Sequence, residues 1–277
     1  MKIDFHTHTT ASDGTMTPKE ILKEAERKGI SYFALSDHDT IDGVNSLTAI
    51  PDAINFITGV EISAEYPSTL HILGYGFDRN DESLKKDLEE LQDYRKNRNY
   101  LILERMRQHG FDITMEELTE EAGGDLIGRP HFASLMLKKG YIRTFQEAFE
   151  RYLKKGAPFY VDKKRFDPRR AIEKISEAGG IAVMAHPYQT KLNDESLETL
   201  LKQLCSYGLQ GIEVFYSGHT PPMTQKYADL AEKYSLMKTA GSDFHGSIKP
   251  DLTLGMDVEA SEIETFLRFA TEKRLRL

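Results

Sequence analysis

The sequence predicts an α/β protein built on a parallel sheet, either a barrel or a doubly wound sheet. Two observations predict this class. Short apolar segments alternate with helix-like segments in the first and the last parts of the chain, and His, Asp or Glu stands near the end of one predicted strand after another. Barrel enzymes collect their reactive side chains at the carboxyl ends of such strands.

The first predicted strand, Lys2 to Phe5, leads directly into His6 and His8. Side chains two residues apart on an extended chain point to the same face, so both imidazoles are expected to project together. Two neutral imidazoles aimed at one point are good ligands for a divalent transition metal. Asp13 follows closely and adds a carboxylate within reach.

The next elements follow the same rhythm. Thr17, Pro18 and Glu20 carry the start signals of a helix that continues to Gly29, and Asp167-Pro168 opens another helix that ends at Gly179-Gly180. Further helices are predicted near 195–207, 222–234 and 262–269. Strands are predicted at 32–36, 55–60, 70–75, 181–185, 211–215 and 236–240.

Residues 81–156 break the alternation, because they are charged and helical throughout. Leu84, Leu88, Leu91, Tyr94 and Leu101 mark the apolar stripe of a long helix, and shorter helices are predicted at 115–121, 130–139 and 144–153. We expect residues 1–80 and 157–277 to form the barrel and 81–156 to form a helical insertion that caps its mouth. The alternative is a peripheral group of helices without a role in catalysis.

Composition narrows the functional classes. The chain has 277 residues, of which 39% are hydrophobic, a net charge of -8 and one cysteine, Cys205. The sequence has no long basic run, which argues against a protein that binds extended duplex nucleic acid. It shows neither an apolar stretch long enough to span a membrane nor a signal peptide, and one cysteine forms no internal disulfide, so we expect a cytoplasmic protein with no membrane partner.

The His, Asp and Glu residues near strand ends form a recurrent pattern. His38 follows the second strand between Asp37 and Asp39, Glu61 follows the third, and the later strands contribute His71, His186, Asp243 and His245. Imidazole and carboxylate without thiolate favour manganese, iron or zinc over calcium. Several such ions held together suit phosphoryl transfer, because they activate water and neutralise charge on the attacking and leaving oxygens.

These motifs, in this order, resemble those of the PHP (polymerase and histidinol phosphatase) superfamily. The resemblance implies a distorted (β/α)7 barrel, similar to a TIM barrel, with a site for two to three divalent ions, of which manganese is favoured and iron or zinc is the alternative. It further implies three ligand sets: His6, His8, Glu61 and Asp243 for one ion; Asp13, His38 and His245 for a second; and His71 and His186, with Glu61 bridging, for a third.

The segment Gly128 to Ala133 resembles the YciV-like phosphoesterases of this superfamily, which include 3′,5′-nucleotide bisphosphate phosphatases and 5′-3′ exoribonucleases. The expected activity is hydrolysis of a phosphate ester on a bisphosphorylated nucleotide or on the 5′ end of short RNA. A metal-bridging hydroxide at the set formed by His6, His8, Glu61 and Asp243 would attack phosphorus in line. Histidinol phosphate is the alternative substrate.

Other residues are candidates for contacting the substrate. Arg129 is expected to bind a second phosphate, and His131 and His219 are candidates for substrate binding or for donating a proton to the leaving oxygen. Arg95 and Arg98 could face the same pocket, but solvated positions are favoured for both. Asp37 and Asp39 are expected to orient ligands or cap a helix.

Two rival classes share part of this pattern. Amidohydrolases also begin with His-x-His and end with Asp, but they usually add a carboxylated lysine on a middle strand, where this chain has Glu61. A metal-bound scaffold without activity is the second rival. The complete ligand set argues against it, because buried imidazoles and carboxylates are costly to retain together without ions.

Overall fold

The computed structural model of the chain describes residues 1–123, 127–162 and 164–277. Within these residues one sheet of eight strands forms the centre, in the order β7-β6-β5-β4-β3-β2-β1-β8. Its strands are β1 (Lys2–Asp4), β2 (Tyr32–Leu35), β3 (Asn55–Ala64), β4 (Leu70–Tyr75), β5 (Ile181–Met184), β6 (Gly211–Tyr216), β7 (Met237–Gly241) and β8 (Met256–Asp257).

The sheet closes on itself through the segments that extend β1 and β7. Phe5 N–H donates to Ala240 O at 3.1 Å, and Asp243 N–H donates to His6 O at 2.8 Å. Thr7 and Phe244 continue this contact as a parallel bridge. The prediction of a distorted, TIM-like barrel is therefore confirmed, and β8 is a short antiparallel strand added beside β1.

One strand departs from the parallel arrangement that the strand–helix alternation predicts. β4 runs antiparallel to both β3 and β5, whereas β1, β2 and β3 and also β5, β6 and β7 pair in parallel. The cause is the connection, because residues 65–69 join β3 to β4 without a helix, and so short a link can only make a hairpin. As a result, β4 begins where β3 ends.

Helices flank the barrel strands and largely match the expected positions. They are α1 (Pro18–Arg27), α2 (Asp42–Asn45), α7 (Pro168–Glu177), α8 (Asp194–Ser206), α9 (Pro221–Lys233) and α10 (Glu264–Glu272), with short 3-10 turns η2 (Pro187–Thr190), η3 (Gly246–Ile248) and η4 (Ala260–Ile263). The predicted start of α1 is confirmed: Thr17 Oγ1 accepts from Glu20 N–H at 3.3 Å, and Glu20 Oε2 accepts from Thr17 N–H at 2.8 Å.

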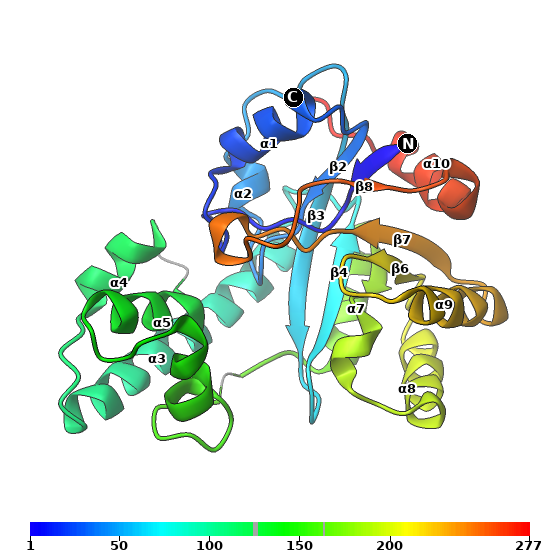
Figure 1. Cartoon of the computed structure of the whole chain (residues 1–277). Helices are drawn as coiled ribbons and strands as arrows, with labels where there is room; N and C mark the ends of the chain where they lie inside the picture. Colours follow the sequence, from blue (N-terminus) through cyan, green and yellow to red (C-terminus); the bar gives the residue numbers. More distant parts are fainter. Residues whose placement is uncertain (124–126, 163) are drawn as a thin grey trace.

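A group of helices between β4 and α7 lies to one side of the barrel (Figure 1). It consists of α3 (Glu82–Gln108), α4 (Met115–Ala122), α5 (Arg129–Lys138), α6 (Phe145–Ala148) and the π-helix η1 (Phe149–Leu153). The first half of α3 packs Leu84 and Leu88 onto the barrel core, and its second half packs Ile102 and Met106 into the core of the helical group. Leu101, expected in the apolar stripe, is 49% exposed.

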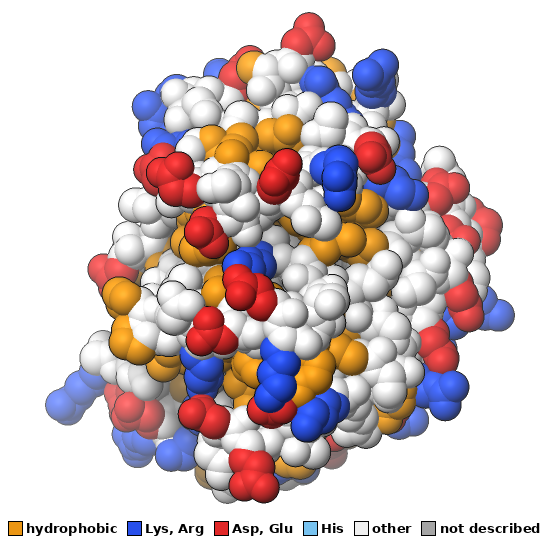
Figure 2. Space-filling view, turned by 90° about the vertical axis from the view of Figure 1, so that its right-hand side faces the viewer, with side chains coloured by type: hydrophobic (Ala, Val, Ile, Leu, Met, Phe, Trp, Pro, Cys, Tyr) orange, Lys and Arg blue, Asp and Glu red, His pale blue; other side chains and the backbone are white. Residues whose placement is uncertain are grey.

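None of the described helices is long and apolar enough to cross a membrane. Figure 2 shows the face that carries α8, α9 and α10, where acidic and basic side chains are interspersed with apolar ones. This face therefore presents no extended basic surface of the kind that duplex nucleic acid requires.

Candidate metal centre

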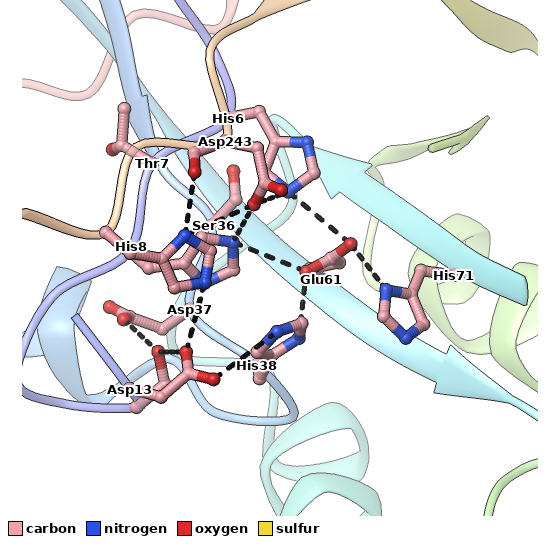
Figure 3. A network of polar contacts seen from close by, with 12 residues as sticks. His6, Thr7, His8, Asp13, Ser36, Asp37, His38, Glu61, His71 and Asp243 are labelled. Carbon is pink, nitrogen blue, oxygen red and sulfur yellow. Dashed lines mark hydrogen bonds and ion pairs between the residues drawn. The ribbon is translucent and has the colours of Figure 1, made fainter. Parts of the chain in front are cut away.

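The chain brings its His, Asp and Glu residues to one end of the barrel. His6 and His8 follow β1, His38 follows β2, and Glu61 lies within β3. Because β4 is antiparallel, His71 at its start lies at the same end, paired with Ser63 of β3. Of the remaining four residues, Asp13 lies in the loop after β1, His186 follows β5, and Asp243 and His245 follow β7. Figure 3 shows the side chains of His6, His8, Asp13, His38, His71 and Asp243 gathered around Glu61.

The carboxylate of Glu61 occupies that centre and faces five imidazoles. Its Oε1 lies 2.7 Å from His71 Nδ1, 2.8 Å from His186 Nε2 and 3.4 Å from His6 Nε2. Its Oε2 lies 2.8 Å from His38 Nδ1 and 3.4 Å from His8 Nε2. One fully buried side chain thus connects ligand candidates from four different strands.

Two other carboxylates extend the cluster. Asp243 Oδ1 lies 3.2 Å from His8 Nε2 and 3.6 Å from His6 Nε2, and Asp13 Oδ1 lies 3.4 Å from His245 Nε2. Four overlapping groups can each hold a cation with ligand atoms within 4.8 Å of one another. The four groups are His8-Asp13-His38-His245, His6-Glu61-His186, His6-His8-Asp243 and His38-Glu61-His71, and together they include all nine residues expected from sequence.

Unsatisfied polar atoms show that these side chains fit metal ions. Among the described residues, His6 Nε2, both ring nitrogens of His8, His38 Nδ1 and Glu61 Oε2 are buried without a hydrogen-bond partner. His38 Nδ1 lies 2.8 Å from Glu61 Oε2, a contact that is an ion pair and does not meet the geometry of a hydrogen bond. Buried lone pairs without partners are costly, and divalent cations would use them.

Electrostatics keep the carboxylates ionised. Burial by itself raises the pKa of Glu61, but the charges of His38, His71 and His6 outweigh it and hold that pKa well below its usual value. The pKa values of Asp13 and Asp243 are likewise well below the ordinary range despite burial, because imidazoles surround both. Ionised carboxylates beside imidazoles are what metal binding requires.

Backbone strain is concentrated in the loops of the centre. His186 has φ +24°, Asp243 has φ +57° and Asp39 has φ +55°, which are left-handed conformations that side-chain-bearing residues rarely adopt. Such strain persists only where surrounding contacts hold it, and it is typical of functional sites.

Asp37 and Asp39 support these loops from outside the cluster. Asp37 accepts from Thr9 N–H at 2.7 Å, Thr9 Oγ1 at 2.8 Å and Ser12 Oγ at 2.6 Å, and so fixes the loop that carries Asp13. Asp39 accepts from Ser63 N–H at 2.8 Å and from Arg95 Nη2 at 2.5 Å. The latter contact connects the centre to helix α3.

A cavity of about 750 Å³ lies beside the centre and is rich in arginine. The prediction that Arg95 and Arg98 are solvated is wrong, since each is 6% exposed and both line this cavity. The face of α3 that carries Arg95 and Arg98 is turned toward the barrel. The spacing of the two residues in the sequence does not show this orientation. The cavity is lined by Asp13, His38 and His71, by the cationic side chains Arg95, Arg98, Arg129, Lys155 and Arg165, by the carboxylates of Glu65 and Asp162, and by the rings of Tyr66, Phe149 and Tyr160.

The three residues expected to contact substrate differ in position. Arg129 lines the cavity at the start of α5 and donates to Leu153 O at 3.1 Å. His131 is buried; its Nδ1 accepts from Gly128 N–H at 3.1 Å, which leaves the ring hydrogen on Nε2. His219 donates from Nδ1 to Val214 O at 2.9 Å, and burial lowers its pKa, so this ring holds a proton on Nε2 poorly. Neither histidine is among the residues that line the cavity.

Sequence reasoning missed several residues of the site. Tyr216 and Lys249 each donate to Asp243 Oδ2 at 2.7 Å, and Glu213 contacts His6 and His186 from beneath the cluster. Glu213 could have been recognised as a site residue because it is a charged residue inside an otherwise apolar strand segment. Lys249 comes from the loop after β7 and contacts one carboxylate, so it does not replace the bridging lysine of an amidohydrolase.

Comparison with known proteins decides the family, because the PHP domain matches residues 4–165. The chain belongs to the PHP domain family. A 5′-3′ exoribonuclease of Haemophilus influenzae is 33% identical, with 88% of this chain and 90% of the relative aligned. A 3′,5′-nucleoside bisphosphate phosphatase of Chromobacterium violaceum is 32% identical over 88% of this chain and 87% of the relative. This PHP protein is thus a phosphoesterase hydrolase.

A solved structure from Chromobacterium violaceum, described as an amidohydrolase with bound sulfate and no metal, shares the fold with a TM-score of 0.88. The two sequences are 29% identical, and the structural match covers 99% of this chain and 97% of the solved chain. Membership of the PHP family, together with the clustered His, Asp and Glu residues, supports binding of divalent metal ions.

Proposed function

We propose that this PHP protein hydrolyses a phosphate ester of a 3′,5′-bisphosphorylated nucleotide or of the 5′ end of a short RNA. One observation carries the proposal: the arginine-lined cavity includes Asp13, His38 and His71 of the metal centre in its wall. A substrate with one phosphate at the centre would therefore extend directly into a cationic pocket.

Two of the arginines in this pocket lack a carboxylate partner in the described part of the chain, whereas Arg95 pairs with Asp39 and Arg165 with Asp162 and Glu65. Among the described residues, neither Arg98 nor Arg129 forms an ion pair with a carboxylate; Arg98 donates instead to Asn99 Oδ1 at 2.7 Å. Burial, reinforced by Arg95, Arg129 and Arg165, lowers the pKa of Arg98 well below its usual value. Guanidinium binds phosphate bidentately, so a second phosphate supplies the charge that the protein itself does not.

The metal ions would be held by the nine residues of the cluster: His6, His8, Asp13, His38, Glu61, His71, His186, Asp243 and His245. When bound, divalent ions supply Lewis acidity and an activated water at neutral pH. Imidazole and carboxylate ligands suit manganese, iron or zinc, and of these the family resemblance favours manganese. The residues of the protein would position the phosphate for in-line attack and stabilise its charge.

Side chains of the cavity suit the rest of a nucleotide. Arg129 lies with its guanidinium 5.7 Å from the centre of the Tyr160 ring, and Tyr66 and Phe149 add further aromatic surface. Aromatic rings stack on bases of any sequence. His131, which carries its ring hydrogen on Nε2, remains the candidate hydrogen-bond donor to the leaving oxygen, and His219 is the weaker candidate because Val214 O already takes its Nδ1 hydrogen.

The same cavity indicates separate roles for the barrel and for the helical insertion. We assign residues 1–80 and 157–277 to the barrel that bears the metal centre, and 81–156 to a helical insertion that caps its mouth. The contribution of Arg95, Arg98 and Arg129 from the helical group to a cavity that also contains metal-ligand candidates supports a capping role. Peripheral helices without a role would not need to bury cations at this boundary.

The two relatives named above act, by their names, on a nucleoside bisphosphate and on RNA from its 5′ end. Histidinol phosphate is the second candidate substrate. Its single phosphate would leave Arg98 and Arg129 unpaired, so the cavity favours a substrate with more negative charge.

The test is turnover by the manganese-loaded protein of a nucleoside 3′,5′-bisphosphate, a short 5′-phosphorylated RNA, histidinol phosphate and an aryl phosphate. We expect the first two to give the highest kcat/KM. Arg129→Ala should impair hydrolysis of the bisphosphate far more than that of the aryl phosphate, whereas Arg107→Ala, at an exposed position of α3, should change neither. Equal losses on both substrates would contradict the role of Arg129, and preference for histidinol phosphate would contradict the substrate class.

A further inference from the structure

Glu213 lies in the middle of β6, directly beneath the metal centre, and is fully buried. No ligand set described above includes it. Its neighbours in the strand, Ile212 and Val214, are apolar and also fully buried. A carboxylate in such surroundings is costly unless it makes specific contacts, so its two oxygens need partners.

Both partners are residues of the centre. Glu213 Oε1 lies 3.0 Å from His6 Nδ1, and Oε2 accepts from His186 N–H at 2.7 Å. The fit is close, because a Cβ on Gly241 of the adjacent strand β7 would lie 2.2 Å from His6 Cβ and 2.9 Å from Glu213 Oε1. Only glycine lets β7 pass this pair without displacing it.

The contact with His6 determines which ring nitrogen can bind metal. A carboxylate accepts hydrogen bonds, so Nδ1 of His6 carries a ring hydrogen, and in the neutral ring that metal binding requires the lone pair is on Nε2. That Nε2 atom is buried without a hydrogen-bond partner and lies 3.4 Å from Glu61 Oε1 and 3.6 Å from Asp243 Oδ1. The lone pair therefore points between the two carboxylates.

The contact with His186 holds a strained residue. His186 has φ +24°, immediately before Pro187, and the bond from its N–H to Glu213 fixes its backbone. In this conformation His186 Nε2 lies 2.8 Å from Glu61 Oε1. A single carboxylate therefore fixes ligand candidates that follow two different strands, β1 and β5.

We propose that Glu213 is a positioning residue of the metal centre, which sets the His6 tautomer and the His186 backbone at once. The proposal rests on the metal centre proposed above. Carboxylates that orient metal-binding histidines commonly change metal affinity by about 10- to 100-fold when they are replaced. We expect a loss of this size on removal of the Glu213 charge.

Glu213→Gln is the sharpest variant, because it preserves shape but provides one acceptor and one donor where the site needs two acceptors. If the amide NH2 faces His6, the ring must move its hydrogen to Nε2 and lose its ligand lone pair. If the NH2 faces His186 N–H, two donors oppose each other. Thr239→Val is the matched control: Thr239 is the buried cross-strand partner of Glu213, and its hydroxyl has no hydrogen-bond partner among the described residues.

The experiment measures Mn²⁺ binding to the metal-free protein by calorimetry and histidine tautomers by ¹⁵N NMR. We expect wild type and Thr239→Val to bind Mn²⁺ equally, Glu213→Gln to bind it about 10- to 100-fold more weakly, and metal-free wild type to show hydrogen on His6 Nδ1. Unchanged affinity in Glu213→Gln would overturn the proposal. So would a neutral His6 in wild type that carries its hydrogen on Nε2 and none on Nδ1, a result that does not depend on whether the variant folds. A wild type that binds no Mn²⁺ would instead refute the metal centre itself.

Discussion

The substitution Arg98→Gln is expected to weaken substrate binding and, at the same time, to increase the stability of the fold. Arg98 is 6% exposed, and its pKa is held well below the usual value by burial and by Arg95, Arg129 and Arg165. A lowered pKa means that the folded state disfavours the charged form, so removal of the charge should stabilise the fold. Glutamine keeps a donor for Asn99 Oδ1, which Arg98 now contacts at 2.7 Å.

The expected effects have opposite signs. An uncompensated buried charge costs about 3–5 kcal/mol where it has been measured, so recovery of even about 1 kcal/mol should raise Tm by about 2–4 °C. Hydrogen bonds to charged groups contribute about 1.5–3 kcal/mol, so KM for a nucleoside bisphosphate should rise by about 10- to 150-fold. Because this binding is remote from the reacting phosphate, kcat should change less than KM.

The assay compares Tm by calorimetry with kcat and KM on the bisphosphate and on an aryl phosphate. Arg107→Gln on the exposed side of the same helix is the control and should leave all of these values unchanged. A fall in Tm would show that the charge is compensated in the fold. An equal rise in KM for both substrates would show that Arg98 does not bind the second phosphate, and either result would refute the reasoning.

Three other predictions concern the metal centre. Asp243→Ala and His245→Ala should each abolish hydrolysis while circular dichroism stays unchanged; normal turnover would remove both from the centre. Asp37→Ala should lower the free energy of unfolding by about 2–4 kcal/mol, because it leaves the Thr9 and Ser12 donors without their acceptor, and chemical denaturation with a midpoint equal to wild type would contradict this. Mn²⁺ at about 100 times its Kd should stabilise the protein by about 2.7 kcal/mol for each occupied site in thermal unfolding, and chelator should reverse the gain; a Tm insensitive to both would count against a metal centre.

The metal-ligand candidates could be predicted because their signal is local. His6 and His8 alternate along an extended segment, and Asp243 and His245 repeat that spacing after the last barrel strand. The end of a strand can be recognised from alternating apolar and polar residues followed by turn residues. The convergence of the ends then follows from the barrel, which the alternation of elements and the family resemblance predicted.

The rest depends on contacts between distant segments. The sequence does not show that β4 reverses, although that reversal carries His71 to the same end as Glu61. Arg98 lies on a charged helix where exposed and buried faces look alike, and only the packing of α3 against the barrel decides which face it is on. Glu213 lies within an apolar strand segment, and the sequence alone does not show that His6 and His186 pack against it.

Closure of the barrel between the segments after β1 and β7 has a consequence for biosynthesis. Asp243 and His245 leave the ribosome more than two hundred residues after His6. Domains fold during translation only as their contacts become available. The ligand set is therefore incomplete until the segment after β7 has been synthesised, and we expect metal binding at the full centre to follow that step.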